Sequence, residues 1–192
     1  MKAHSTKDKI LKEGRSLLQR HGYNGFSFQD IANAINIKKP SLYDHYKTKE
    51  DLILAILHYY SKSFDEWTCE VMHLNPLEQI RKVFDIFYSF SCDKRKVCPV
   101  LALTADTQIL TPHIQTEMKL FISKWMTWLE SQIAAGQKIK TIRTDIKPKT
   151  LASLIYNQVM GSQFQARILN DPNVITKSGD SMITFIQLSF NN

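Results

Sequence analysis

The sequence predicts an all-α protein, and three observations lead to this prediction. Apolar residues recur every three to four positions through most of the chain, as they do along one face of a helix. No segment shows the strict alternation of apolar and polar residues that is typical of β-strands. Breaks such as Asn75-Pro76, Thr111-Pro112 and Asp171-Pro172 divide the chain into segments of helical length.

Residues 5–20 form the first predicted helix. Ser5 and Asp8 have the spacing of a capping box, in which each side chain accepts a hydrogen bond from the other residue's backbone N–H. Gly22 ends the helix. Its apolar stripe consists of Ile10, Gly14, Leu17 and Leu18.

Residues 27–46, SFQDIANAINIKKPSLYDHY, predict two short helices joined by a tight turn. Ser27 and Asp30 again have capping spacing, and the apolar positions that follow fit one face of a helix. Asn36 tolerates the left-handed backbone of a tight exit. Pro40 suits the first turn of the second helix, where a missing N–H costs nothing. This arrangement is a helix-turn-helix, a unit that reads DNA.

The distribution of charge agrees with a nucleic-acid partner. The formal net charge is +7, and residues 1–50 contain ten of the 25 Lys and Arg but only five of the 18 Asp and Glu. The excess positive charge therefore coincides with the helix-turn-helix, where phosphates would need it. A basic surface without any partner is the alternative interpretation.

The run from Thr6 to Leu57 resembles the N-terminal domain of TetR-type transcriptional regulators. The matching features are the Ser27-Phe28 entry, the Asp30-Ile31-Ala32 run, the segment from Ser41 to Tyr46 and the exit from Lys47 to Leu52. The sequence departs from the family at Asn36, where glycine is usual. The resemblance implies a homodimer that binds double-stranded operator DNA, most simply as a repressor, and that responds to a small-molecule effector.

The resemblance implies that the second short helix enters the major groove of DNA. The residues predicted to read bases are Lys38, Lys39, Ser41, Leu42, Tyr43 and His45. The residues predicted to contact phosphates are Ser27, Tyr43, Tyr46, Lys47 and Lys49. Tyr46 fits a place in the core equally well.

We predict a DNA-binding domain over residues 1–47, a linking helix over 48–69 and a C-terminal ligand-binding and dimerisation domain over 70–192. Thr48 and Asp51 have the capping spacing that begins the linking helix. The further predicted helices begin near Leu77, Val100, Pro112, Pro148 and Asn173, and the last one ends at Phe190.

The body is rich in aromatic residues, which either fill an ordinary core or line an apolar cavity, as the family resemblance implies. The predicted ligand-binding residues are Phe84, Phe87, Tyr88, Cys98, Asp106, Phe121, Trp125, Trp128, Tyr156 and Phe164. Polar groups for such a cavity are expected from Asp106, Gln108, His113, Gln158 and Gln163.

Apolar stripes on the last two predicted helices have two interpretations. They form either an intramolecular core or, as the resemblance implies, a seam of four helices between two copies of the chain. The residues predicted for the seam are Leu151, Ile155, Val159, Gly161, Ser162, Met182, Ile183 and Ile186.

The three cysteines, Cys69, Cys92 and Cys98, have no CxxC or zinc spacing, and free thiols are typical of a reducing cytoplasm. Cys98 follows Lys94, Arg95 and Lys96 and precedes Pro99 at a helix start. Cations and a helix N-terminus favour the reactive thiolate, and the position resembles that of cysteines in electrophile-sensing members of the family. An inert, partly buried thiol is the alternative.

No catalytic motif is found, which argues against an enzyme. The sequence lacks a G-x-S-x-G elbow, a phosphate-binding glycine loop and an H-E-x-x-H pair, so we expect no cofactor and no metal. No stretch has the roughly 18 to 20 apolar residues of a membrane span. An architectural DNA-binding protein without an effector is the second functional interpretation.

Overall fold

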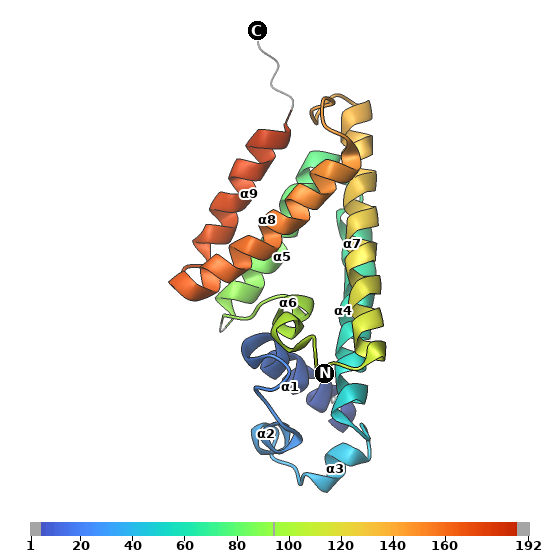
Figure 1. Ribbon diagram of the computed structural model, residues 1–192, viewed down its shortest axis with the longest axis vertical. Helices are drawn as coiled ribbons and strands as arrows, with labels where there is room; N and C mark the ends of the chain where they lie inside the picture. Colours follow the sequence, from blue (N-terminus) through green and yellow to red (C-terminus); the bar gives the residue numbers. More distant parts are fainter. Residues whose placement is uncertain (1–4, 94, 188–192) are drawn as a thin grey trace. The chain divides into compact units, whose positions relative to one another are not determined.

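The computed structural model describes residues 5–93 and 95–187, and every regular element in these ranges is a helix (Figure 1). One isolated bridge of extended backbone pairs Ile142 with Gln187. The prediction of an all-α fold is confirmed. The elements are α1 (Thr6–His21), α2 (Phe28–Ala34), α3 (Pro40–Tyr43), α4 (Lys49–Val71), α5 (Pro76–Cys92), α6 (Pro99–Leu103), the 3-10 helix η1 (Thr104–Asp106), α7 (Pro112–Lys138), α8 (Pro148–Leu169) and α9 (Asn173–Ile186).

Side-chain caps begin several helices where the sequence predicts them. The Ser5 hydroxyl accepts a hydrogen bond from the N–H of Asp8, and the Asp8 carboxylate accepts one from the N–H of Ser5. Thr48 and Asp51 form the same reciprocal pair at the start of α4. Each pair satisfies amide donors that the first turn of a helix leaves open.

The segment after Cys98 is less helical than predicted. A helix from Val100 to Leu110 is expected, but α6 ends at Leu103 and a single 3-10 turn follows. The hydroxyl of Thr104 donates to the carbonyl oxygen of Leu101, and that of Thr107 donates to the carbonyl oxygen of Thr104. Such side-chain bonds to the backbone compete with the helical ladder. The end predicted for the last helix, Phe190, lies outside the described residues.

The chain divides into two compact units, which we call the head unit and the body unit. The head unit comprises Met1–Phe64 and Cys98–Phe121, and the body unit comprises Asp65–Val97 and Ile122–Asn192. Helices α4 and α7 contribute residues to both. This division groups α6, η1 and the first part of α7 with residues 1–64, whereas the predicted DNA-binding domain covers residues 1–47.

Each unit has its own apolar core. In the head unit α1 packs against α2 and α6, and a methyl group added at Gly14 would lie 3.1 Å from Leu52 of α4. In the body unit α5, α8 and α9 pack against one another, and Gly179 allows α9 to approach the Phe84 ring. The side chains of Ile10, Leu18, Ile80 and Leu129 are completely buried.

The described residues contain neither a membrane-spanning helix nor a group of side chains that would hold a metal ion. None of their helices has the length and apolar character that crossing a bilayer requires. No group of three or more His, Cys, Asp or Glu side chains gathers there in a way that would hold a metal ion.

Candidate functional site

The helix-turn-helix forms at the predicted residues. The Ser27 hydroxyl accepts a hydrogen bond from the N–H of Asp30 and so begins α2. Asn36 has a φ of 56°, the left-handed conformation predicted for it. The N–H of Ile37 then donates to the carbonyl oxygen of Ala32 at 3.0 Å. The turn between α2 and α3 is therefore closed by backbone geometry.

The inward side of the helix-turn-helix is apolar. Ile31 and Leu42 have no exposed surface, and Phe28 and Tyr46 are 6% and 5% exposed. The prediction that Leu42 reads bases is wrong, because the single turn of α3 directs Leu42 into the core. Tyr46 belongs to the core as well, which is the second of its two interpretations.

The outward side carries most of the predicted DNA-binding residues. Tyr43 is 42% exposed although its ring lies 5.2 Å from that of Phe28. Ser41 is half-buried. On one exposed surface, cationic side chains can bind DNA phosphates and hydrogen-bonding side chains can contact base edges. The exposed predicted residues are Ser27, Lys38, Lys39, Tyr43, His45 and Lys47.

Lys49 has a structural role that the sequence did not reveal. Its ammonium donates to the carbonyl oxygens of Tyr23 and Phe26 in the loop between α1 and α2. The ammonium also lies 4.7 Å and 4.2 Å from the centres of those two rings. Burial lowers the pKa of Lys49, and the charges of Asp106 and Asp30 oppose this change. Lys49 therefore fixes a loop, in contrast to the predicted phosphate contact.

Asp106 holds the same loop from the other side. Its carboxylate accepts hydrogen bonds from the N–H of Tyr23 at 3.1 Å and from the Asn24 amide at 2.8 Å. The sequence predicts Asp106 as a ligand-binding residue, and in the structure both of its carboxylate oxygens accept hydrogen bonds from the loop. Gln108 and His113 are exposed, so they do not supply polar groups to an interior cavity.

An aromatic cluster forms inside the body unit. The rings of Trp67 on α4 and Trp125 on α7 stack with centres 5.8 Å apart. Trp128 lies 5.1 Å from Trp67, and Phe87 of α5 lies 5.6 Å from Trp125. Phe87 and Trp125 are almost fully buried, whereas Trp67 and Trp128 are half-buried. Three helices thus contribute to one apolar surface with partly accessible rings.

The other predicted ligand-binding residues fall into two groups. Phe84 and Phe121 are buried, and Tyr156 is half-buried. Tyr88 is 36% exposed and Phe164 is 64% exposed. The prediction that these last two line an interior cavity is wrong, because each lies on the outward side of its helix. Of the remaining polar candidates, Gln163 is buried and donates to the carbonyl oxygen of Val159, and Gln158 is half-buried.

Cys98 is 1% exposed, and burial raises the pKa of its thiol to about 11. Backbone hydrogen bonds from Leu101 and Val100 oppose this rise only in part. The expectation that cations and the helix start favour the thiolate is wrong, because desolvation outweighs them. Lys94 of the neighbouring basic loop lies outside the described residues. The structure agrees with the interpretation of Cys98 as an inert thiol.

We expect the raised pKa of Cys98 to appear in the pH dependence of stability. Between pH 9 and 11 the unfolded chain loses the thiol proton while the folded chain keeps it. The free energy of unfolding then falls by about 1.4 kcal/mol per pH unit from this group. Urea unfolding from pH 7 to 11 should show a shallower decline for Cys98→Ala than for wild type. Cys92→Ala, at an exposed position, should decline like wild type; equal slopes for all three would contradict the assignment.

The predicted dimer residues lie largely inside the chain itself. The prediction that they meet a partner is wrong for those that are buried, because they form the packing of α8 and α9 within the body unit. Gly161 and Met182 are the exceptions: a methyl group added at Gly161 would meet no atom within 4 Å, and Met182 is half-buried. The buried residues are Leu151, Ile155, Val159, Ser162, Ile183 and Ile186.

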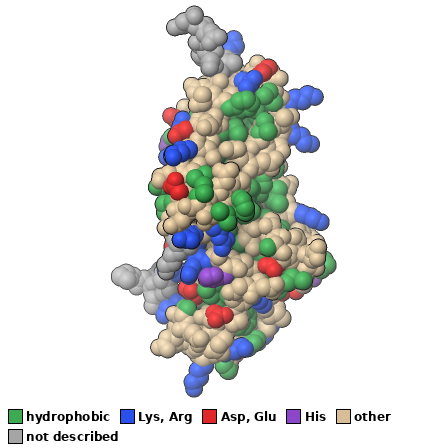
Figure 2. Space-filling model, turned by 60° about the vertical axis from the view of Figure 1, so that its left-hand side comes forward, with side chains coloured by type: hydrophobic (Ala, Val, Ile, Leu, Met, Phe, Trp, Pro, Cys, Tyr) green, Lys and Arg blue, Asp and Glu red, His purple; other side chains and the backbone are tan. Residues whose placement is uncertain are grey.

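A different set of apolar side chains faces outward from these two helices. Hydrophobic side chains gather in patches on the face that Figure 2 draws. On α8 they recur at helical spacing and share a side with Gly161. The sequence contained this signal, since Phe164 and Ile168 lie four residues apart and off the buried stripe. The exposed residues are Leu154 (41%), Phe164 (64%), Ile168 (70%), Leu169 (65%) and Phe185 (45%).

Comparison with known proteins identifies the family. The profile described as "Bacterial regulatory proteins, tetR family" matches residues 10–56, and that described as "Tetracyclin repressor-like, C-terminal domain" matches residues 76–182. The chain belongs to the TetR family. TetR-family proteins are transcriptional regulators that bind DNA, which confirms the predicted class and the expectation that the chain is not an enzyme.

Individual TetR-family relatives are distant in sequence but match most of the chain. The HTH-type transcriptional repressor DhaR of Mycobacterium sp. (strain GP1) is 21% identical over 161 residues, which are 83% of this chain and 81% of DhaR. A TetR transcriptional regulator from Legionella pneumophila has a TM-score of 0.88 at 28% identity and covers 97% and 100% of the two chains. AibR, solved in complex with isovaleryl coenzyme A and operator DNA, has a TM-score of 0.72 at 22% identity and covers 95% and 98%.

Proposed function

We propose that this TetR-family protein is a repressor that binds a palindromic operator as a homodimer and leaves it when a small apolar or aromatic molecule binds the body unit. The observation that carries the proposal is the course of α4. This helix begins at Lys49, directly after the helix-turn-helix, and contributes Trp67 to the aromatic cluster. A ligand that displaces Trp67 acts on the helix whose first residue fixes the head loop.

The exposed side of the helix-turn-helix is the proposed DNA surface. The residues that would face base edges lie within α3 or next to its two ends, and they are Lys38, Lys39, Ser41, Tyr43 and His45. Lys47 and Ser27 flank this group and would contact phosphates. A dimer with two-fold symmetry would then occupy two half-sites about 34–36 Å apart, one turn of the double helix.

Replacement of Lys47 by Met should weaken binding to every DNA sequence and reduce its dependence on salt. Lys47 is exposed, so its loss removes a phosphate contact and leaves the fold intact. Each lost contact lowers the slope of log K against log salt by about 0.9. Fluorescence anisotropy with operator and random duplexes at several salt concentrations measures this slope. Lys119→Met, an exposed change on α7, is the charge-matched control; if both variants keep the wild-type slope, Lys47 does not contact phosphate.

The aromatic cluster is the proposed effector site. Pockets for small molecules are lined mainly by apolar and aromatic side chains, and Trp67 and Trp128 are both partly accessible. The AibR complex supports the view that a protein of this fold can hold a small molecule and operator DNA together. Because an effector must prefer one of two head arrangements, its binding and operator release are thermodynamically linked.

A titration with naphthalene, indole and biphenyl derivatives tests the linkage. An effector should raise the unfolding temperature, alter tryptophan fluorescence and lower operator affinity over one concentration range. Trp128→Leu should shift all three responses to higher concentrations. A compound that saturates the change in tryptophan fluorescence but leaves operator affinity unchanged binds the protein without releasing DNA. If every compound that binds behaved in this way, the interpretation as an architectural DNA-binding protein without an effector would replace the proposal.

A further inference from the structure

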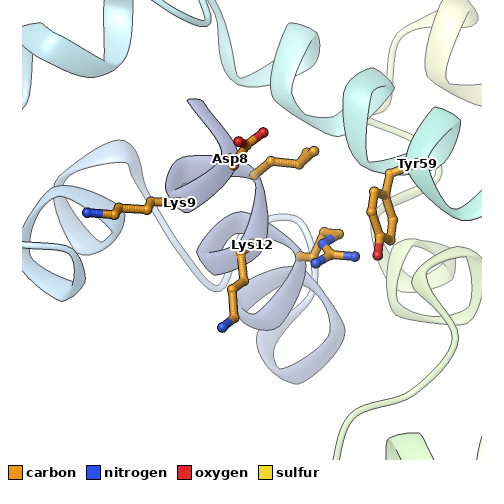
Figure 3. Close-up of a pocket in the computed structure, with 6 residues that line it drawn as sticks. Asp8, Lys9, Lys12 and Tyr59 are labelled. Carbon is orange, nitrogen blue, oxygen red and sulfur yellow. The ribbon is translucent and has the colours of Figure 1, made fainter. Parts of the chain in front are cut away.

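A groove of about 460 Å³ lies between α1 and α4 in the head unit. Figure 3 shows the Tyr59 ring extending from α4 on the side of α1, while Lys9 extends away from it. The volume falls within the range of about 300–1,000 Å³ that small-molecule sites occupy. The lining residues are Asp8, Lys9, Leu11, Lys12, Arg15 and Tyr59.

Arg15 and Tyr59 give this groove both a cation and an apolar wall. The Arg15 guanidinium lies 3.5 Å from the centre of the Tyr59 ring and 5.7 Å from that of Tyr60. A guanidinium stacked on a ring keeps its N–H donors directed along its edge, where they match a carboxylate. The Arg15 Nε is buried and has no hydrogen-bond partner in the described part of the chain.

The remaining groups define the charge of a suitable ligand. Lys12 adds a second cation from the same helix, one turn before Arg15. Asp8 is the one carboxylate among the lining residues, and its Oδ2 already accepts hydrogen bonds from the N–H and hydroxyl of Ser5. Leu11 and the 40% exposed Tyr59 provide apolar surface. The lining therefore combines net positive charge with a ring and an aliphatic side chain.

We propose that this groove binds a small organic anion in which a carboxylate is attached to an apolar or aromatic group. The carboxylate would accept hydrogen bonds from Arg15 and Lys12, and the apolar group would pack on Leu11 and Tyr59. The site is separate from the aromatic cluster, because its lining comes from α1 and the head part of α4.

DNA phosphate is the other anion that these cations could meet, and the geometry favours the smaller ligand. Tyr59 lies ten residues beyond Lys49, which at about 1.5 Å per residue is about 15 Å along α4 from the end that follows α3. The DNA backbone could interact with the cations of the groove, but it has no apolar group to pack on the Tyr59 ring. An aromatic carboxylate could use both the cations and the ring.

Titration of the full-length protein with 2-naphthoate, in the absence of DNA, tests the proposal. Two-dimensional ¹H–¹⁵N spectra should show the amide shifts concentrated in residues 8–15 and 55–63. The neutral analogue 2-(hydroxymethyl)naphthalene and inorganic phosphate should each bind at least about tenfold more weakly, since each lacks one half of the recognition. Shifts confined to residues 65–97 and 122–187 would place the ligand in the body unit and overturn the proposal. The absence of any shift would overturn it as well, and neither result contradicts effector binding in the body unit.

Two variants assign the anion contact. Arg15→Gln should weaken 2-naphthoate binding by about tenfold or more, because it removes a charge-assisted hydrogen bond. Lys12→Gln changes an accessible side chain that the fold does not need, and it should weaken binding by a few-fold. Lys119→Gln should leave affinity within about twofold of wild type. Unchanged naphthoate affinity in both Lys12→Gln and Arg15→Gln would refute the site. The site would also be refuted if these variants bound naphthoate like wild type but showed a weaker salt dependence of operator binding, because that result would assign the two cations to DNA.

Discussion

Glutamate in place of Phe164 or Ile168 should convert the protein to monomers and abolish tight operator binding. These two side chains are 64% and 70% exposed in the single chain and share the outer side of α8 with Leu154 and Gly161. Soluble proteins rarely leave such a continuous apolar strip uncovered. We therefore propose that the outer side of α8 forms the dimer interface, where an unpaired buried charge costs several kcal/mol.

Loss of the dimer should reduce operator affinity by more than the loss of a single protein–DNA contact would. A dimer engages its second half-site as an intramolecular event, so losing the partner lowers operator affinity by about 10²–10⁴-fold. Sedimentation velocity and operator titration measure the two effects. Ile139→Glu introduces the same charge at a residue that is 55% exposed elsewhere in the body unit, and it should remain dimeric. An intact dimer in both α8 variants would exclude this side of α8.

The features that the sequence predicted correctly depend on residues close together along the chain. The Ser5–Asp8 and Thr48–Asp51 caps require only the right side chains three positions apart. The left-handed Asn36 likewise follows from local backbone preferences. Helix starts and the helix-turn-helix could therefore be derived before any packing was known.

The faces of α8 could not be assigned in this way. Leu151 and Ile155 recur at helical spacing on one side, and Phe164 and Ile168 do so on another. Periodicity shows that each side is apolar, but only the positions of α5 and α9 decide which side is covered within the chain. The buried residues of the predicted seam therefore belong to the intramolecular core, and the uncovered side of α8 could be identified only from the three-dimensional structure.

Electrostatic roles were the least predictable part of the site. The cations that precede Cys98 in sequence suggested a lowered pKa, but desolvation of a 1% exposed thiol dominates. Burial is a property of the packed chain, and no local spacing reveals it. For the same reason Lys49 looked like its neighbour Lys47, although one ammonium is engaged by the head loop and the other is exposed.

Replacement of Lys49 by Met should destabilise the head unit while leaving the salt dependence of DNA binding unchanged. Met keeps the aliphatic length of lysine but removes the donor shared by the carbonyl oxygens of Tyr23 and Phe26. Losing charge-assisted hydrogen bonds to partly buried acceptors costs about 2 kcal/mol. In a chain of this size that lowers the unfolding temperature by about 4–8 °C. Operator affinity should fall because the loop leads directly into α2, yet no phosphate contact is lost.

Lys47→Met is the matched control for Lys49→Met, two positions away and with the same chemical change. It should keep the wild-type unfolding temperature within about 1–2 °C, because exposed substitutions rarely exceed about 0.5 kcal/mol, and it should lower the salt slope. Calorimetry and anisotropy on the two variants thus give opposite patterns if the assigned roles are right. If Lys49→Met instead lowered the salt slope and left the unfolding temperature unchanged, the assigned role would be wrong. The Lys49 ammonium would then contact phosphate in the DNA complex, and its hydrogen bonds to the carbonyl oxygens would not stabilise the loop.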